Sequence, residues 1–320
     1  MIKKYLNKFF IYFICFSIVF VYIVNVKVVW IDLIESSSYR IPYLLIFTIL
    51  TTLLGWSLFK TMFTDPGRVP QNWGFFLNDP EQKKRKFCLI CHIFKPERCH
   101  HCSACNRCVL NMDHHCPWIN NCVGFQNRKF FMQMLFYVIL DSYCAVIGLG
   151  YGLYVEFKNI TLYLNSEGDL HFIDALLLLC AFGISCLASC LITMFFKFHL
   201  ELVLSNRTTI ENLEKKRNEE TGQQNDDFNQ YDLKPYYNWV QVFGMSKLSW
   251  FLPIQMEGGR PVGDGILWPK NHHNDSLLLK DHVSNPIYNG NGDNFQMQQY
   301  NNQLLHSNNQ QFRSSSTQHQ

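Results

Sequence analysis

The sequence predicts an all-α polytopic membrane protein, with four transmembrane helices and a cytosolic zinc-binding Cys-rich domain between the second and the third. Three observations predict this class. Of the 320 residues, 48% are hydrophobic and only 17% are charged, against roughly 25% in ordinary soluble domains. The apolar residues gather in four blocks of about 20, the length that crosses a hydrocarbon core of ~30 Å. Eight of the thirteen cysteines lie between Cys88 and Cys122.

The four apolar blocks are the expected helices. The first, 9–24, follows a short basic start and has no small-residue cleavage site after it, so we interpret it as a helix and not as a signal peptide. The second, 41–59, carries no charge. The third is 130–155, with Asp141 near its middle, and the fourth is 172–196. An acid at that depth is costly, so Asp141 should face the interior of the bundle.

The distribution of Lys and Arg predicts the orientation of these helices. Segment 60–129 has eleven and the N-terminus three, whereas loops 32–40 and 156–171 have one each. Basic residues favour the cytosolic side of a membrane. Both termini and the Cys-rich segment are therefore expected in the cytosol, a reducing compartment that favours metal binding over disulfides.

Composition also divides the chain. The net charge of +3 gives no basic face for nucleic acid, so no nucleic-acid partner is expected. The end of the chain is rich in Asn and Gln and is expected to be disordered. The expected domains are helices 1 and 2 (1–60), a cytosolic linker (61–87), the Cys-rich domain (88–130), helices 3 and 4 (131–198), a cytosolic C-terminal segment (199–269) and the tail (270–320).

The Cys-rich segment has the spacing of a metal-binding domain. C-x2-C pairs occur at 88/91, 99/102, 102/105 and 105/108. Zinc takes four S or N ligands, often from such pairs. With the histidines at 100, 101, 114 and 115, twelve candidate ligands fall within 35 residues. Two four-ligand sites would use eight of them, and a segment this short would depend on the metal to fold.

The ligands left over are candidates for chemistry. Asp113, His114 and Cys116 lie within four residues of one another. A thiolate is a nucleophile that a nearby His can activate, and an Asp on the other ring nitrogen would orient that His. The alternative is that Cys116 is one more thiol of the metal-binding region.

The segment from Cys88 to Phe130 resembles the Cys-rich domain of the DHHC family of membrane protein S-acyltransferases (palmitoyltransferases). The resemblance includes the Asp-His-His-Cys tetrad at 113–116, the Pro-Trp that follows it and Asn-Cys-Val-Gly at 121–124. Three further motifs stand where the family has them: Asp65-Pro66-Gly67, Thr-Thr-Ile-Glu at 208–211 and the aromatic motif at 238–244.

The resemblance implies a role for each residue of the cluster. One zinc would take Cys88, Cys91, His101 and Cys108, and the other Cys102, Cys105, His115 and Cys122. Cys116 would then be the nucleophile, His114 its base and Asp113 the residue that orients the base. Cys99 departs from the usual pattern, and we interpret it as a spectator.

The resemblance also implies the reaction and its partners. Cys116 would take a long-chain acyl group from acyl-CoA, its co-substrate, and pass it to cytosolic cysteines of membrane or peripheral protein substrates, with an accessory subunit possible. Lys95, Arg98 and His100 would contact the CoA phosphates, unless they are simply a solvated basic face, and Trp118 would lie near the reacting centre. The basic run at 83–86 is expected to attract anionic lipid. The implied location is the Golgi, endoplasmic reticulum or plasma membrane.

Three further residues carry expectations of their own. Thr208 and Glu211 have the spacing of a helix capping box. Asp141 would limit the length of the acyl chain, since in the family the third helix helps to shape the end of the acyl cavity, or pair with Asn25 or Thr51.

A membrane-anchored zinc scaffold, such as a RING-like ubiquitin ligase module, is the alternative function. It would explain the cytosolic metal sites and the helices. It gives no reason for Asp113, His114 and Cys116 to stand together outside the ligand sets.

Overall fold

The computed structural model describes residues 2–33, 38–75, 85–163, 172–222 and 229–271. The expected disorder of the Asn/Gln-rich tail lies outside the described residues, apart from residues 270 and 271 at its start. Half of the basic run at 83–86 is outside them as well.

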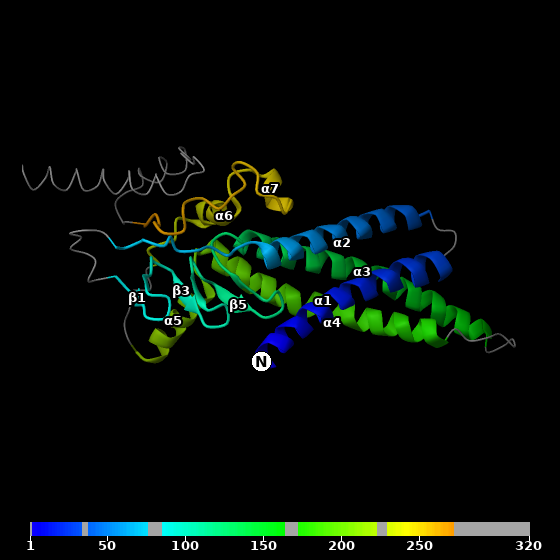
Figure 1. Cartoon of the computed structure of the whole chain (residues 1–320). Coiled ribbons are helices and arrows are strands. Elements are labelled where there is room, and N and C mark those ends of the chain that lie inside the picture. The colour runs from blue at the N-terminus through cyan, green and yellow to red at the C-terminus, as the bar shows by residue number, and fades with distance from the viewer. Residues whose placement is uncertain (1, 34–37, 76–84, 164–171, 223–228, 272–320) are drawn as a thin grey trace, which may run out of the picture. The chain divides into compact units, whose positions relative to one another are not determined.

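Four long helices run alongside one another (Figure 1). The first, α1 (Ile2–Ile23), continues into a π-helical segment, η1 (Val24–Leu33), and is followed by α2 (Arg40–Phe63), α3 (Arg128–Tyr163) and α4 (Phe172–Leu204). Each is long and apolar enough to cross a bilayer. This confirms the prediction of four membrane-capable helices, although α3 and α4 extend beyond the apolar blocks.

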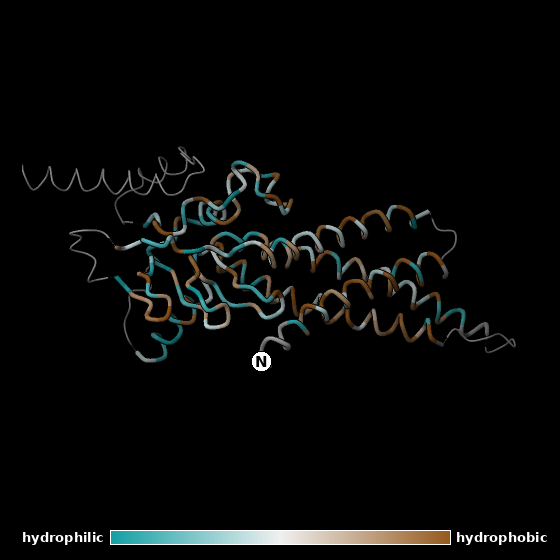
Figure 2. The backbone as a smooth tube through the Cα atoms, in the orientation of Figure 1, coloured by the Kyte–Doolittle hydropathy of each residue, from teal (hydrophilic) through white to brown (hydrophobic). Residues whose placement is uncertain are grey.

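The four long helices are largely hydrophobic along their length (Figure 2), and many of their large apolar side chains are exposed. Leu187, Leu191 and Met194 of α4 are more than half exposed, while Val29 and Phe47 are fully buried. Rows of exposed large apolar side chains are rare on soluble proteins. The surface of this bundle is therefore suited to hydrocarbon.

Six short strands form the Cys-rich segment, so the all-α prediction is wrong in this part. The strands are β1 (Phe87–Cys88), β2 (Ile93–Phe94), β3 (His100–Cys102), β4 (Arg107–Val109), β5 (His114–Cys116) and β6 (Asn121–Val123). They pair only as three antiparallel hairpins, β1–β2, β3–β4 and β5–β6. The C-x2-C pairs at 88/91 and 102/105 lie at tight turns, and such a turn brings the two short segments beside it together as strands. Strands of two or three residues leave no signal in the hydropathy pattern, so they were not predicted.

Within the described residues after α4 there are three short helices. They are α5 (Thr209–Glu220), α6 (Pro235–Phe243) and α7 (Leu248–Phe251). The predicted capping box is confirmed, because the Thr208 hydroxyl accepts from the Glu211 backbone and the Glu211 carboxylate accepts from the Thr208 backbone. In Figure 1 these helices and the hairpins lie at one end of the bundle, which is also the end where α1 begins.

A polar stripe on α3 holds the C-terminal segment against the bundle. Lys129 donates to the carbonyls of Ile254 and Gly259. One turn further, Gln133 donates to three carbonyls in segment 249–252, and Tyr137 donates to the carbonyl of Phe251. Because these side chains recur every four residues, they share one face of the helix.

Candidate active site and metal centres

The three hairpins are copies of one unit, repeated every 14 residues. His101 pairs with Cys108 in the second hairpin, and His115 pairs with Cys122 in the third. The first has Phe87 and Phe94 in the equivalent pair. Each unit turns at a residue with positive φ, and these residues are His92 (53°), Asn106 (51°) and Asn120 (48°). This 14-residue repeat was not predicted from the sequence.

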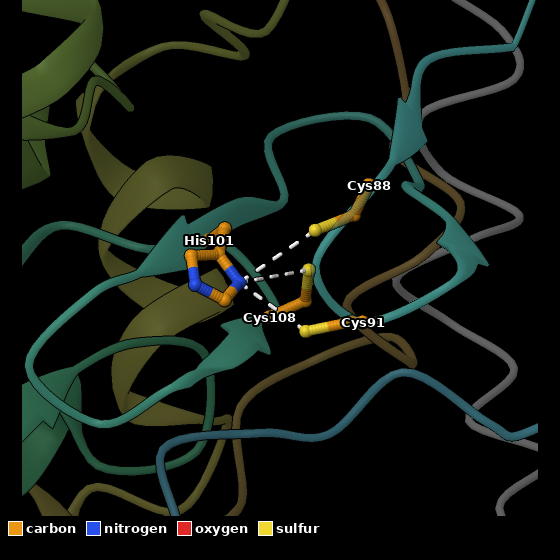
Figure 3. A group of neighbouring side chains, drawn as sticks. All are labelled: Cys88, Cys91, His101 and Cys108. Atoms are coloured by element: carbon orange, nitrogen blue, oxygen red, sulfur yellow. Dashed lines mark hydrogen bonds between the residues drawn. The ribbon is translucent and has the colours of Figure 1, made fainter.

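The first ligand set joins the first and second hairpins (Figure 3). The Nδ1 atom of His101 lies 3.2 Å from the sulfur of Cys91, 3.6 Å from that of Cys88 and 4.0 Å from that of Cys108. The Cys pair comes from the turn of one hairpin, and the His and the last Cys are a cross-strand pair of the next.

The second set joins the second and third hairpins in the same way. The Nδ1 atom of His115 lies 3.4 Å from the sulfur of Cys105 and 3.7 Å from those of Cys102 and Cys122. In both sets the four donor atoms lie within 4.8 Å of one another. Ligands at 2.0–2.3 Å from a tetrahedral zinc are separated by about 3.3–3.8 Å, so three thiols and one imidazole at these distances fit a metal ion such as zinc.

Cys116 is the first Cys of the third unit, equivalent to Cys88 and Cys102. The residue three positions later, which is Cys91 or Cys105 in the earlier units, is Ile119 in the third. There is no fourth hairpin to supply a His and a Cys, because α3 begins at Arg128. The repeat therefore ends with a thiol that belongs to neither ligand set.

Asp113 is fully buried beside this thiol. Its Oδ2 accepts from Nδ1 of His114 at 2.6 Å and from the hydroxyl of Thr209 at 2.7 Å. Its Oδ1 accepts from the backbone of Thr209 at 3.0 Å and lies 3.3 Å from a guanidinium nitrogen of Arg128. Burial raises the pKa of this carboxyl, but the charge of Arg128 and the bond from His114 outweigh it, so the pKa lies well below its ordinary value.

His114 lies between Asp113 and Cys116. Burial lowers the pKa of its imidazole, but the hydrogen bonds to Asp113 and Cys116 outweigh that effect and raise the pKa to about 9. Phe131 packs edge-on against the ring at 5.3 Å between centroids. The structure therefore brings the predicted Asp, His and Cys into one connected chain of contacts.

Cys116 lies in an apolar cluster of buried side chains. It is 7% exposed and packs with Leu54 and Leu58 of α2 and with Phe131 and Leu135 of α3. Ile14 and Ile18 of α1 border the same cluster. The thiol thus stands where the Cys-rich hairpins meet the apolar bundle.

Arg98 is built into the protein and does not face solvent. Its guanidinium donates to both carboxylate oxygens of Glu211, at 2.7 and 2.8 Å, and twice to Asn206. It also lies between the rings of Tyr231 and Trp268, 4.5 and 4.4 Å from their centroids. Contact of Arg98 with the CoA phosphates would require this buried clamp to open, and it stays a prediction.

The other expected contacts are differently placed. Lys95 and His100 are half-buried beside the first ligand set. Trp118 is 43% exposed and its ring lies 4.4 Å from that of Phe10 in α1. Cys99 is buried, and burial raises the pKa of its thiol to about 12.

Several residues that support the site were not predicted. Asn121 donates to the carbonyls of Thr61, Met62 and Thr64 and so caps the end of α2 against the third hairpin. Arg128 and His199 face Asp113 from α3 and α4. A basic residue or His at the end of an apolar block is a usable signal, because burying it requires a partner.

Asp113, His114 and His199 also lie close enough to hold a metal ion. However, the two Asp113 oxygens already accept from His114 and Thr209, and the Arg128 guanidinium lies beside them. A nearby positive charge disfavours a cation. We therefore interpret this group as a hydrogen-bonded cluster.

Comparison with known proteins identifies the family to which the chain belongs. A profile described as DHHC palmitoyltransferase matches residues 81–216. The chain is 36% identical over 267 residues to probable protein S-acyltransferase 14 of Arabidopsis thaliana, covering 75% of this chain and 82% of that protein. It is 32% identical over 294 residues to palmitoyltransferase ZDHHC20 of Homo sapiens, covering 80% and 75%. The chain belongs to the DHHC palmitoyltransferase family.

Proposed function

We propose that this protein is a protein S-palmitoyltransferase that moves a long-chain acyl group from acyl-CoA to cysteine thiols of protein substrates through an acyl-Cys116 intermediate. The names of its relatives and the family match support the activity. The contact chain Asp113–His114–Cys116 supports the intermediate. The scaffold alternative is not favoured, because it uses none of these three residues.

The first half-reaction would load the enzyme. The Cys116 thiolate attacks the carbonyl carbon of the acyl-CoA thioester, a new C–S bond forms, and the C–S bond to CoA breaks. The proton taken from Cys116 rests on His114, whose raised pKa suits it to hold that proton. The CoA thiolate leaves and takes that proton, so the base is free again.

The second half-reaction would unload it. His114 takes the proton of a substrate cysteine, the resulting thiolate attacks the acyl-Cys116 carbonyl, and Cys116 leaves as a thiol after regaining the proton. A thioester replaces a thioester in both steps, so the site contributes positioning and activation and not driving force. The carboxylate of Asp113, held by Thr209 and Arg128, keeps the imidazole oriented throughout.

Two zinc ions are proposed for the two ligand sets. Cys88, Cys91, His101 and Cys108 would hold one, and Cys102, Cys105, His115 and Cys122 the other. Zinc in closed four-ligand sites supplies cross-linking and not catalysis. By fixing His115 on strand β5, the second set would fix the neighbouring His114 and Cys116.

The helices and the basic residues support a membrane orientation. We propose that the hairpins, α5–α7 and both termini lie in the cytosol, where soluble acyl-CoA and substrate cysteines are available. The apolar cluster around Cys116 would then face the bilayer, and Trp118 beside Phe10 would lie at the interface that Trp favours. The membrane would be that of the Golgi, endoplasmic reticulum or plasma membrane.

Lys95 and His100 remain the proposed contacts for the CoA phosphates. The acyl chain would lie among the helices. Asp141 of α3 accepts a hydrogen bond from Thr51 of α2 at 2.6 Å, which is one of the two pairings expected for it. We propose that this pair limits the space for the acyl chain. Asp141→Ala with Thr51→Val should accept longer acyl-CoAs than the parent, and an unchanged chain-length profile would contradict the proposal.

The test of the function is autoacylation of the full chain. The parent and Cys116→Ser are purified in detergent and given labelled palmitoyl-CoA, and zinc is measured in both. Thioester-linked label on the parent alone, removed by hydroxylamine, with equal zinc in both, is the expected result. Equal label on both proteins would contradict Cys116 as the nucleophile.

A further inference from the structure

A small cavity lies behind the catalytic Asp113, between the Cys-rich hairpins and the C-terminal segment. The cavity volume available to a water molecule is about 10 Å³. Its lining includes Asn111, Arg128 and Trp268, from three separate parts of the chain. A space of this size accommodates about one water molecule.

The polar atoms around the cavity include three that are buried and have no hydrogen-bond partner among the described residues. They are Nε of Arg128, Nε1 of Trp268 and Oδ1 of Asn111. Arg128 and Asn111 are 2% and 4% exposed. An unpaired buried donor or acceptor costs about 1–3 kcal/mol, so three at one small cavity need a common explanation.

We propose that this cavity is a binding site for one internal water molecule. The two nitrogens donate and the amide oxygen accepts, so the ligand must accept two hydrogen bonds and donate one. Water has this capacity. A chloride ion would face the oxygen of Asn111, and a cation would face the guanidinium of Arg128.

The water would give the Arg128 guanidinium a hydrogen-bond partner at Nε, which has none among the described residues. A guanidinium nitrogen of Arg128 already donates to the carbonyl of Arg207 at 2.6 Å and lies 3.3 Å from Asp113. The water would contact Nε, the nitrogen next to that one on the same edge of the planar group. The site would thus connect Trp268, in the segment that follows α7, with the residue that faces the catalytic carboxylate.

Replacement of single tryptophans tests this site. Trp268→Phe keeps an aromatic ring beside Arg98 and Phe125 and removes the indole N–H, together with part of the ring volume. Trp239→Phe is the matched control, since its Nε1 is also buried without a partner but Trp239 does not line the cavity. Removing a donor that binds water destabilises the protein, whereas removing an unpaired one is neutral or stabilising.

Both replacements shrink a packed ring, so we expect the melting temperature of the full chain to fall for both. It should fall further for Trp268→Phe than for Trp239→Phe, because only Trp268→Phe also removes a donor to the bound water. An experimental structure of the parent, at a resolution that separates ordered waters, should show one density peak within hydrogen-bond distance of all three atoms. An empty cavity, or a Trp268→Phe protein as stable as the Trp239→Phe control, would overturn the proposal. Neither measurement depends on acyl transfer, so failure of the site and failure of the proposed function are distinguishable.

Discussion

The second and third hairpins have the same fold, but we propose different roles for their first cysteines, Cys102 and Cys116. Both carry His-His-Cys on their first strand, at 100–102 and 114–116, with the second His opposite a Cys in each. They differ in the residue before that triplet, which is Cys99 in one and Asp113 in the other. The pKa of His100 is lowered because of burial, whereas the pKa of His114 is raised to about 9 through Asp113 and Cys116.

The comparison indicates how a metal-binding repeat can supply a nucleophile. Cys102, the first Cys of the second unit, is a member of the second ligand set. Its equivalent in the third unit, Cys116, belongs to neither set because the repeat ends there. In the third hairpin the carboxylate of Asp113 is a fixed charge beside His114, and it raises the pKa of that imidazole. Equivalent substitutions in the two hairpins should therefore fail in different ways.

The largest expected effect is that of Cys102→Ser. It removes a thiol from the second ligand set, and binding of a structural zinc contributes about 10–16 kcal/mol in small zinc domains. We expect about one zinc ion fewer per chain, a large loss of thermal stability and loss of autoacylation. Zinc analysis and thermal unfolding check this. Retention of the full zinc content would contradict the ligand assignment.

Asp113→Asn should act on the rate and leave the metal in place. In hydrolase triads the equivalent change reduces the rate by about 10⁴-fold, and we expect about 10²–10⁴-fold slower autoacylation with unchanged zinc. Cys99→Ser is the matched change in the second hairpin, and it should alter the rate by less than about threefold if Cys99 is a spectator, within the usual range for a neutral substitution. Equal effects of the two substitutions would remove the distinction between the hairpins.

Thr209→Val should have a smaller effect. It removes a hydroxyl that donates to Asp113, and a hydrogen bond to a charged group contributes about 1.5–3 kcal/mol, so we expect about 10–100-fold slower acylation. Thr208→Val is the control, because it removes the cap of α5 and costs about 1 kcal/mol of stability. Steady-state acylation and thermal unfolding separate the two. A Thr209→Val protein with the parent's rate would show that Asp113 does not need this contact.

The smallest expected effect is on pH dependence of stability. The folded pKa of His114 is about 9, above its ordinary value of about 6.5. Protonation of His114 therefore contributes stability that is fully present below about pH 6.5 and is lost as the pH rises through about 9. The difference in melting temperature between the parent and His114→Gln should shrink over this range. A constant difference would contradict the raised pKa.

The apolar helices could be predicted from sequence because burial in a bilayer leaves a signal in every residue of a block. The cost of an acid at that depth predicted a polar partner for Asp141, and Thr51 was one of the two candidates. The capping box was also evident, since it depends on a fixed spacing of two residues.

What escaped prediction depends on contacts between distant segments. In the sequence Arg98 resembles a solvent-exposed basic residue. In the structure it is buried against Asn206 and Glu211, which are more than 100 positions away. The strands were missed because two or three residues carry no period. The contact of Arg128 with Asp113 also exists only after α3 is brought against the third hairpin.

The most direct test of this account maps the acyl group within the parent protein. The zinc-loaded chain is incubated briefly with palmitoyl-CoA, digested, and examined by mass spectrometry for acylated peptides. The account predicts the acyl group on Cys116 and none on the equivalent Cys102, with two zinc ions retained. An acyl group on Cys102, or on Cys116 only after zinc is lost, would contradict it.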